Sequence, residues 1–381
     1  MALKVARRGA TPPFIVMDVL RAANERQAAG AAVYHLEVGQ PGTGAPPRVL
    51  AAARAALDGH RLGYTEALGM PSLRARIARH YEERYGVRVP QERVIVTTGS
   101  SGAFVTAFLA AFDPGDRVAL AAPSYPAYRN ILSALGVEPV ILEASEATRF
   151  QPTVELIRKA GPLDGLIVAS PSNPTGTMLL PEELAALARH CAHAGIRLVS
   201  DEIYHGISYG RRAATALAAS EEAVVVNSFS KYYSMTGWRI GWMVAPADLV
   251  RPIECLAQNL YISPPTLSQI AAEAAFECSP ELDAIVAGYA RNRALLLREL
   301  PRAGFDHLAP ADGAFYLYAD VGRLTNDSEA FSRRMLLETG VAATPGVDFD
   351  SARGQRFLRF SFSGAAAEIA AAAEALKAWR R

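Results

Sequence analysis

The sequence has few cysteines and no cluster of them. Its 381 residues include only Cys191, Cys255 and Cys278, which lie far apart and form none of the C-x-x-C pairs that bind metals. Because three thiols cannot all pair within one chain, we expect reduced cysteines and a cytoplasmic location. The seven histidines show neither an H-E-x-x-H motif nor a spacing that pairs them with cysteine, so we expect no metal site.

An excess of one charge and a long apolar run are also absent. The 39 basic and 38 acidic residues are interspersed and leave a formal net charge of +1, which predicts no surface for nucleic acid or an anionic membrane. Residues 1–14 carry cations, but no continuous apolar stretch follows them. No apolar run in the sequence approaches the length of about 20 residues that is needed to span a bilayer. We therefore expect a soluble, unexported protein with neither of these partners.

Short β-branched runs alternate with amphipathic segments between residues 72 and 230. This alternation is typical of strands joined by helical crossovers, and it predicts an α/β fold with a mainly parallel sheet. Strands are predicted at residues 93–99, 117–123, 137–142, 164–171, 196–204 and 223–230, and helices at 72–86, 100–112, 128–136, 153–161 and 181–195.

The pattern changes beyond residue 280. One long helical pattern covers residues 281–300, and shorter strands follow at 313–321 and 356–363, with two more helices. A chain of 381 residues exceeds the size of about 250–300 residues at which single cores stop growing. We therefore expect a second, smaller lobe at the C-terminus, joined by the N-terminal segment.

Ligands of open parallel sheets bind beyond the carboxyl ends of the strands, so the residues there are the candidates for a site. The segment Gly99–Ser100–Ser101–Gly102 follows one strand and begins a helix, where backbone N–H groups and hydroxyls could bind a phosphate. Taken alone, the same residues also suit an ordinary helix cap.

Three further strands end in polar side chains. Tyr125 could stack on a flat ring, although most buried tyrosines only pack. Asn173 lies in the turn PSNPTG and could donate a hydrogen bond, or the segment could be a plain β-turn. Asp201 ends a hydrophobic run shortly before Tyr204, so its carboxylate would need a donor or a cationic partner unless it caps a helix.

Lys231 follows the last of these strands, with Ser228 three residues before it and Arg239 eight after it. A lone lysine is most often solvated. Together, however, these segments supply a phosphate site, a second phosphate cation in Arg239, a stacking ring, two donors, a carboxylate and an amine.

The order of these segments resembles that of the class I aminotransferases, which belong to the fold type I enzymes that use pyridoxal 5′-phosphate and are related to aspartate aminotransferase. The resemblance covers most of the chain and rests on LEVGQP (36–41), YTEALGMPSLR (64–74), PSNPTG (171–176), DEIY (201–204), SFSKYYSMTGWRIGW (228–242) and RFLRFSFS (356–363). It implies a large domain at 46–280 with a mainly parallel, seven-stranded-type sheet, and a smaller α+β domain made of 1–45 and 281–381. It also implies a homodimer.

The resemblance assigns a role to each candidate. Lys231 resembles the lysine that forms the internal aldimine, and Asp201 the partner of the pyridinium nitrogen. Asn173 and Tyr204 resemble the donors to the ring hydroxyl oxygen, and Tyr125 the ring that stacks on the cofactor. The residues that resemble phosphate ligands are Ser100, Ser101, Gly102, Ser228 and Arg239, with Tyr64 reaching the phosphate from the neighbouring subunit. Arg359 and the backbone of Gly39, together with Asn173, match the groups that hold the substrate α-carboxylate.

The implied activity exchanges an α-amino group between an amino acid and a 2-oxo acid by a ping-pong mechanism. Lys231 must attack as a neutral amine, so we expect burial and nearby cations to lower its pKa. Dicarboxylate-specific relatives carry an arginine shortly before an S-P-P turn, whereas residues 256–266 here hold no basic residue, so the distal pocket stays open.

Two other functions fit parts of the pattern. A lyase of similar fold would eliminate at Cβ or Cγ, including cleavage of a C–S bond, and would release ammonia. A transcription regulator with an aminotransferase-like domain would need a basic N-terminal DNA-binding domain, but only about 35 residues precede LEVGQP.

Overall fold

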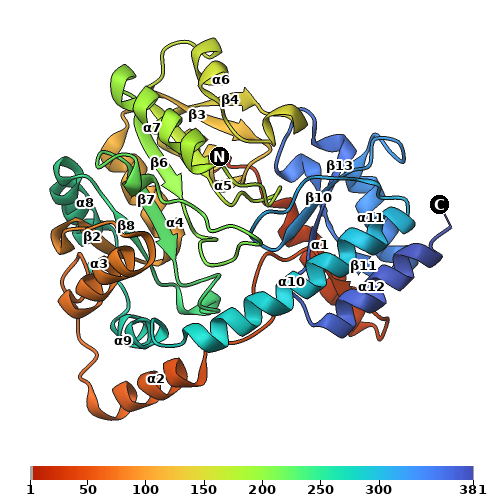
Figure 1. The fold of residues 1–381 in the computed structure, drawn as a ribbon, viewed down its shortest axis with the longest axis horizontal. Helices are drawn as coiled ribbons and strands as arrows, with labels where there is room; N and C mark the ends of the chain where they lie inside the picture. The colour runs from red at the N-terminus through yellow and green to blue at the C-terminus, as the bar shows by residue number, and fades with distance from the viewer. Residues whose placement is uncertain (1–2, 381) are drawn as a thin grey trace.

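The computed structural model describes residues 3–380 and contains a seven-stranded sheet with helices on both faces (Figure 1). The strand order is β2-β8-β7-β6-β5-β3-β4, and all neighbours from β7 to β4 are parallel, while β8 is antiparallel to both β7 and β2. The predicted α/β fold with a mainly parallel sheet is confirmed. The strands are β2 (Val94–Thr97), β3 (Arg117–Ala122), β4 (Glu138–Glu143), β5 (Gly165–Ala169), β6 (Arg197–Asp201), β7 (Val224–Ser228) and β8 (Gly241–Val244).

Successive side chains of the central strands enter two different cores. On β7, Val224 and Val226 pack in one core and Val225 packs in the other, as the two-residue period of a strand requires. Helices α4 (Gly99–Ala111), α5 (Ala127–Leu135) and α8 (Ala247–Leu260) cover the first face, and α3 (Pro71–Tyr85), α7 (Pro181–Ala194) and α9 (Thr266–Ala275) contribute to the second. Burial on both faces explains why these strands are continuous apolar runs.

Several sequence-based boundaries were wrong by a few residues, and two of them bear on the site. The predicted strand at 196–204 ends at Asp201, because Oδ1 of Asp201 accepts a hydrogen bond from the amide of Ile203 (3.0 Å) and turns the chain away from the sheet. Helix α4 begins one residue earlier than predicted, at Gly99, whose φ of +73° suits glycine. Strand β8 was not predicted from the sequence.

A second, four-stranded sheet has the order β12-β13-β10-β9, and each pair of neighbouring strands is antiparallel. The long helix predicted at 281–300 is present as α10, and two more helices follow it. These elements are β9 (His307–Leu308), β10 (Tyr316–Asp320), β12 (Thr344–Pro345) and β13 (Phe357–Ser361), with α10 (Ser279–Arg302), α11 (Ser328–Thr339) and α12 (Ala366–Ala378).

The N-terminal residues lie beside this second sheet. Strand β1 (Tyr34–His35) pairs in parallel with β11 (Val341–Ala342), and α1 (Ile15–Ala28) precedes it. Helix α2 (Pro47–Gly59) projects from the molecule next to α9 (Figure 1). The pairing of β1 with β11 is compatible with a small domain built from both ends of the chain, and its boundaries stay a prediction.

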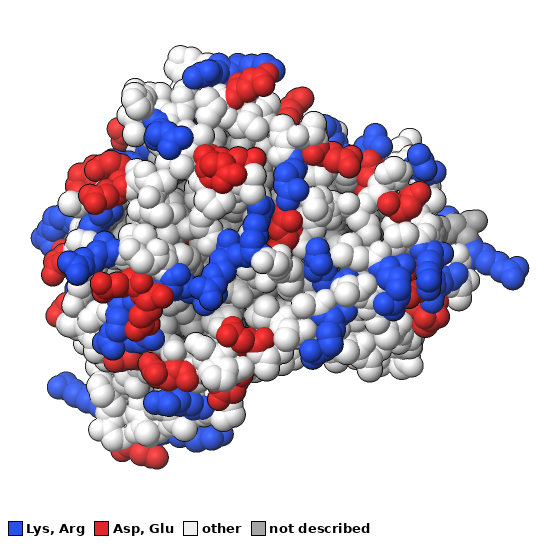
Figure 2. Space-filling model, in the orientation of Figure 1, with Lys and Arg blue, Asp and Glu red and all other residues white. Residues whose placement is uncertain are grey.

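The surface carries both signs of charge. On the face shown in Figure 2, basic and acidic side chains are interspersed over most elements. Among residues 3–380, none of the helices combines the length and the apolar character that crossing a bilayer requires. The same residues contain no group of three or more His, Cys, Asp or Glu side chains placed to hold a metal ion.

Candidate active site

A pocket of about 290 Å³ lies at the carboxyl ends of the central strands, between the two sheets. Of the thirteen candidate residues named from the sequence, ten line it: Gly39, Ser100, Ser101, Tyr125, Asn173, Asp201, Tyr204, Lys231, Arg239 and Arg359. The parallel sheet therefore brings together segments that are up to 320 positions apart, from Gly39 to Arg359. The remaining three, Gly102, Ser228 and Tyr64, lie outside the lining.

Lys231 lies directly after the buried strand β7 and is partly buried. Its Nζ donates a hydrogen bond to the carbonyl of Gly39 and lies 5.9 Å from the ring centroid of Tyr204. Burial, together with the charges of Arg359 and Arg239, lowers the pKa of Lys231 to about 8, against the opposing effect of Asp201. The predicted direction of this shift is confirmed, and an amine with such a pKa is partly neutral near pH 7.

Asp201 is 4% exposed at the end of β6. Its Oδ2 accepts a hydrogen bond from the hydroxyl of Tyr128, on α5, and its Oδ1 accepts the amide of Ile203. Burial raises the pKa of Asp201 to about 6, while these two donors and Lys231 act to lower it. A buried carboxylate of this kind can hold a cation above it.

Arg359 is 3% exposed on β13, and its guanidinium is fixed on several sides. Nη1 donates to Oδ1 of Asn173 (2.8 Å), and Nη2 donates to the carbonyl of Glu37 and to Oγ1 of Thr344 (3.2 Å). Nε is buried and has no hydrogen-bond partner within residues 3–380. A guanidinium held in place by its neighbours is suited to bind a carboxylate.

Tyr316 also lines the pocket, although it was not predicted from the sequence. Its hydroxyl is 2.7 Å from that of Tyr204, and its ring centroid lies 4.4 Å from Cζ of Arg359. A Cβ at Gly39 would overlap the Tyr316 hydroxyl, which explains why position 39 needs a glycine. Tyr316 lies within the predicted strand 313–321, where nothing distinguished it from a packing residue.

The start of α4 and Arg239 lie together and are chemically suited to an anion. Ser100 and Ser101 lie in the first turn of α4, where backbone N–H groups have no partner within the helix. A Cβ added at Gly99 would lie 2.6 Å from Nη2 of Arg239, so the guanidinium packs directly on this turn. Arg239 itself has a φ of +50°, and its Nη1 donates to the carbonyl of Thr236 (2.9 Å).

Ser228 lies behind this site rather than in it. Its hydroxyl donates to Oγ of Ser230 (2.9 Å) and to the carbonyl of Ile240 (3.2 Å), and Ser230 lines the pocket in its place. Gly102 lies further along α4, where a Cβ would overlap Oγ1 of Thr98. Ser230 was not predicted as a site residue from the sequence.

Tyr125 and Tyr64 differ in their surroundings. Tyr125 lines the pocket, and its ring stacks on that of Phe14, with the centroids 5.8 Å apart and the planes 26° apart. Tyr64 is 83% exposed and lies between α2 and α3. Within one chain, Tyr64 takes no part in the pocket.

These groups fit a phosphorylated pyridine aldehyde. The start of α4 with Arg239 suits its phosphate, the carboxylate of Asp201 suits a protonated ring nitrogen, and the partly neutral amine of Lys231 suits its aldehyde. Arg359, with Nε unpartnered, leaves a position for a carboxylate in the same pocket.

Residues 31–376 match the model of the family "Aminotransferase class I and II", so the chain belongs to this family. It is a transaminase that moves an amino group between an amino acid and a 2-oxo acid.

The similar proteins agree with this assignment. The chain is 53% identical to the valine–pyruvate aminotransferase of Mycobacterium tuberculosis, over all of this chain and 99% of the relative. It superposes on the crystal structure of an aminotransferase from Mycobacterium tuberculosis with a TM-score of 0.97 at 53% identity, covering 99% of both chains. It superposes on the aspartate aminotransferase of Thermus thermophilus, solved with maleate, with a TM-score of 0.93 at 32% identity, again covering 99% of both chains.

Proposed function

We propose that this transaminase uses pyridoxal 5′-phosphate, held covalently by Lys231, and acts on neutral amino acids. When bound, this cofactor supplies a ring that accepts the electrons of the bond broken at the substrate Cα. The observation that carries the proposal is the convergence of Lys231, Asp201 and Arg239 on one pocket. The family assignment supports it independently.

Each residue of the pocket would then have a distinct task. The first turn of α4 and Arg239 hold the phosphate, with the hydroxyl of Ser230 beside them. Asp201 keeps the ring nitrogen protonated, and Tyr128 keeps Asp201 ionised by donating a hydrogen bond to it.

Lys231 and Arg359 would act on the substrate. Arg359 binds the α-carboxylate together with Asn173, which fixes the Cα–H bond relative to the ring. Lys231 would be freed when the substrate amino group takes its place on the cofactor. With a pKa of about 8, it would then take the proton from Cα as a neutral amine and deliver it to the carbon that was the aldehyde of the cofactor. Its hydrogen bond to the carbonyl of Gly39 holds it on the substrate side of the pocket.

We further propose valine as the amino donor and pyruvate as the acceptor. The name of the relative at 53% identity supports this choice. The absence of a basic residue at 256–266 also supports it, because a distal carboxylate would be left without a cation there.

A screen of the purified protein tests the proposal. Each amino acid is supplied with pyruvate, and alanine is measured together with ammonia. Formation of alanine from valine, without ammonia, is the expected result. Ammonia release without alanine would support the lyase, and turnover of aspartate alone would contradict the neutral substrate.

We also propose a cytoplasmic homodimer in which Tyr64 reaches the partner's phosphate site. Several apolar side chains are exposed around the projecting α2 and the end of α8, a gathering that marks interfaces. They are Leu50 (36% exposed), Leu57 (61%), Tyr64 (83%), Leu260 (53%) and Ile262 (48%). The three free cysteines support the cytoplasmic location.

A further inference from the structure

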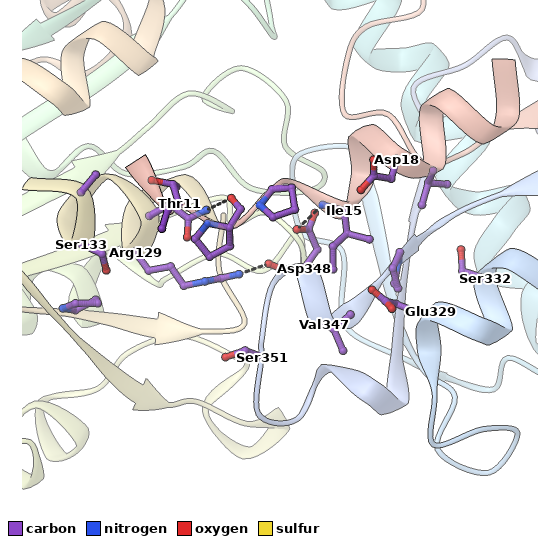
Figure 3. Close-up of a pocket in the computed structure, with 18 of the residues that line it drawn as sticks. Thr11, Ile15, Asp18, Arg129, Ser133, Glu329, Ser332, Val347, Asp348 and Ser351 are labelled. Atoms are coloured by element: carbon purple, nitrogen blue, oxygen red, sulfur yellow. Dashed lines mark hydrogen bonds between the residues drawn. The ribbon is translucent and has the colours of Figure 1, made fainter. Parts of the chain in front are cut away.

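The beginning of α1 forms one wall of the active-site pocket. Phe14, Val16 and Met17 line this pocket, whereas Ile15 and Asp18 line a second cavity of about 770 Å³ on the other side of the segment. Figure 3 shows this second cavity, with Ile15 and Asp18 among the residues that line it. The segment is therefore a single layer of chain between two cavities.

Little apolar burial holds this layer in place. Of the 14 residues of α1, all within the described part of the chain, Ala23 alone is fully buried, where it packs with Leu336 and Ala342. Phe14, at the N-cap position, makes no capping hydrogen bond with its side chain. The second half of α1 is thus anchored, and its first turn needs other contacts.

Asp348 supplies the missing cap from the far end of the chain. Its Oδ1 accepts the amide of Ile15 (3.1 Å) and its Oδ2 accepts the amide of Val16 (3.3 Å), 333 and 332 positions away (Figure 3). Asp348 is 2% exposed, and Nη2 of Arg129 donates to its backbone carbonyl (2.6 Å). A carboxylate at this position satisfies free N–H groups and faces the positive end of the helix.

The wall that Asp348 holds is apolar. Among the described residues, the cations that line the pocket are Lys231, Arg239 and Arg359, and each already has a task. Phe14, Val16 and Met17 offer only hydrocarbon, aromatic and thioether surface. Such a wall favours an aliphatic substrate side chain and disfavours a carboxylate.

We propose that Asp348 is a positioning residue for substrate specificity: by capping α1, it holds Phe14, Val16 and Met17 against the substrate side chain. This inference rests on the proposed transaminase function. A branched side chain such as that of valine contacts the wall more extensively than the methyl group of alanine. Displacing the wall therefore weakens the reaction of valine more than that of alanine.

The test compares Asp348→Ala and Asp348→Asn with Asp18→Asn as the matched control. Asp18 also lies in the first turn of α1, but it pairs with Arg21 (2.7 Å) and faces the other cavity. Single half-reactions with valine and with alanine give kcat/KM for each. Hydrogen exchange of the peptide covering residues 12–20 reports the amides of Ile15 and Val16.

In Asp348→Ala, the ratio of kcat/KM for valine to that for alanine should fall about tenfold, a typical value for lost contacts of one or two methyl groups. In the same variant, the amide hydrogens of Ile15 and Val16 should exchange with solvent faster than in the wild type. Asp348→Asn should give a ratio and exchange rates between those of Asp348→Ala and the wild type. If Asp348→Ala does not fold, Asp348→Asn alone provides the test. Asp18→Asn should change neither quantity.

Three results would overturn the inference: an equal fall for both substrates, a changed ratio with unchanged exchange, or faster exchange with an unchanged ratio. An effect through the nearby Arg359 would lower kcat/KM for valine and for alanine alike and leave their ratio unchanged. The ratio therefore distinguishes it from displacement of the wall. A wild-type protein that reacts with neither amino acid would instead refute the proposed function.

Discussion

The hydroxyl of Tyr128 donates a hydrogen bond to Oδ2 of Asp201, and both buried side chains line the pocket. This bond opposes the burial that raises the pKa of Asp201 to about 6. Without it the carboxylate would hold its proton at higher pH, because the ionised form would lose a donor. Tyr128 therefore keeps Asp201 charged under neutral conditions.

Tyr128→Phe should move the acid limb of the kcat/KM profile to higher pH by roughly one unit, the size expected for a lost hydrogen bond to a charged group. Activity should fall near pH 6 and approach that of the wild type near pH 8.5. Tyr209→Phe is the matched control, since it removes the bond from a tyrosine hydroxyl to the carbonyl of Ala314 (2.8 Å) away from Asp201. An acid limb that stays in place would separate Tyr128 from the ionisation of Asp201.

Arg359→Ala should lower kcat/KM by about 100-fold or more for every amino acid alike, as expected when a buried carboxylate loses its charged partner. Arg359→Lys keeps the positive charge but lacks the planar pair of guanidinium donors. Its kcat/KM should fall less than that of Arg359→Ala, again by the same factor for every amino acid. Arg356→Lys, at an exposed ion pair with Asp320, is the control. Steady-state kinetics with several amino acids decide the point, and a loss confined to one substrate would place Arg359 in the side-chain pocket instead.

Mixing two inactive variants tests the role of Tyr64 in a homodimer. Tyr64→Ala and Lys231→Ala should each be weakly active or inactive, but their heterodimer has one site with an intact Lys231 and a partner that retains its tyrosine. Random reassociation should restore about a quarter of the wild-type activity, since half of the dimers are mixed and one of two sites is intact. No recovery in mixed dimers, verified by mass, would place Tyr64 outside the neighbouring site.

Glu202, next to Asp201, should make stability depend on pH. It is 1% exposed, and burial raises its pKa to about 8 despite hydrogen bonds to Oε1 from Ser200, Thr215 and Ala216. An unfolded chain has the ordinary pKa near 4.5, so the folded protein binds an extra proton between pH 4.5 and 8. Its contribution to stability is therefore present at low pH and lost as the pH rises through this range.

Glu202→Gln should remove that dependence. Relative to this variant, the wild type should lose about 1.4 kcal/mol of unfolding free energy per pH unit between pH 4.5 and 8, and the difference should stay constant above pH 8. Denaturant unfolding at several pH values measures it. Glu222→Gln, a change at an exposed residue, is the control, and its free energy of unfolding should follow that of the wild type at every pH. If the free energies of unfolding of Glu202→Gln and the wild type ran parallel across the whole pH range, the proposed ionisation would be excluded.

Much of the fold could be predicted because its signals are local. The two-residue and 3.6-residue periods placed most strands and helices, and the carboxyl ends of parallel strands then brought Asp201, Asn173 and Lys231 to one edge. The predicted end of β6 was wrong because Ile203 continues the apolar pattern in the sequence, whereas in the structure the side chain of Asp201 turns the chain. Resemblance to a family supplied the individual roles, which no spacing could give.

The residues that escaped prediction depend on distant contacts. Tyr128 and Tyr316 look like packing residues until the fold places them beside Asp201 and Arg359. The cap of Asp348 on Ile15 joins positions 333 apart, and no local pattern encodes it. Ser228 was expected at the phosphate, but it is the last residue of β7, and its hydroxyl bonds to Ser230 and to the carbonyl of Ile240. Ser230 lies in the turn that follows β7 and lines the pocket, and the local sequence does not show where this turn begins.

The central claim is that Lys231 holds the cofactor. Reduction of the coloured holoenzyme with borohydride, followed by proteolysis and mass spectrometry, identifies the residue that carries the pyridoxyl group. The account predicts the group on Lys231, and no coloured, reducible form in Lys231→Ala. A pyridoxyl group on another lysine, or a Lys231→Ala protein that keeps its colour and full turnover, would contradict it.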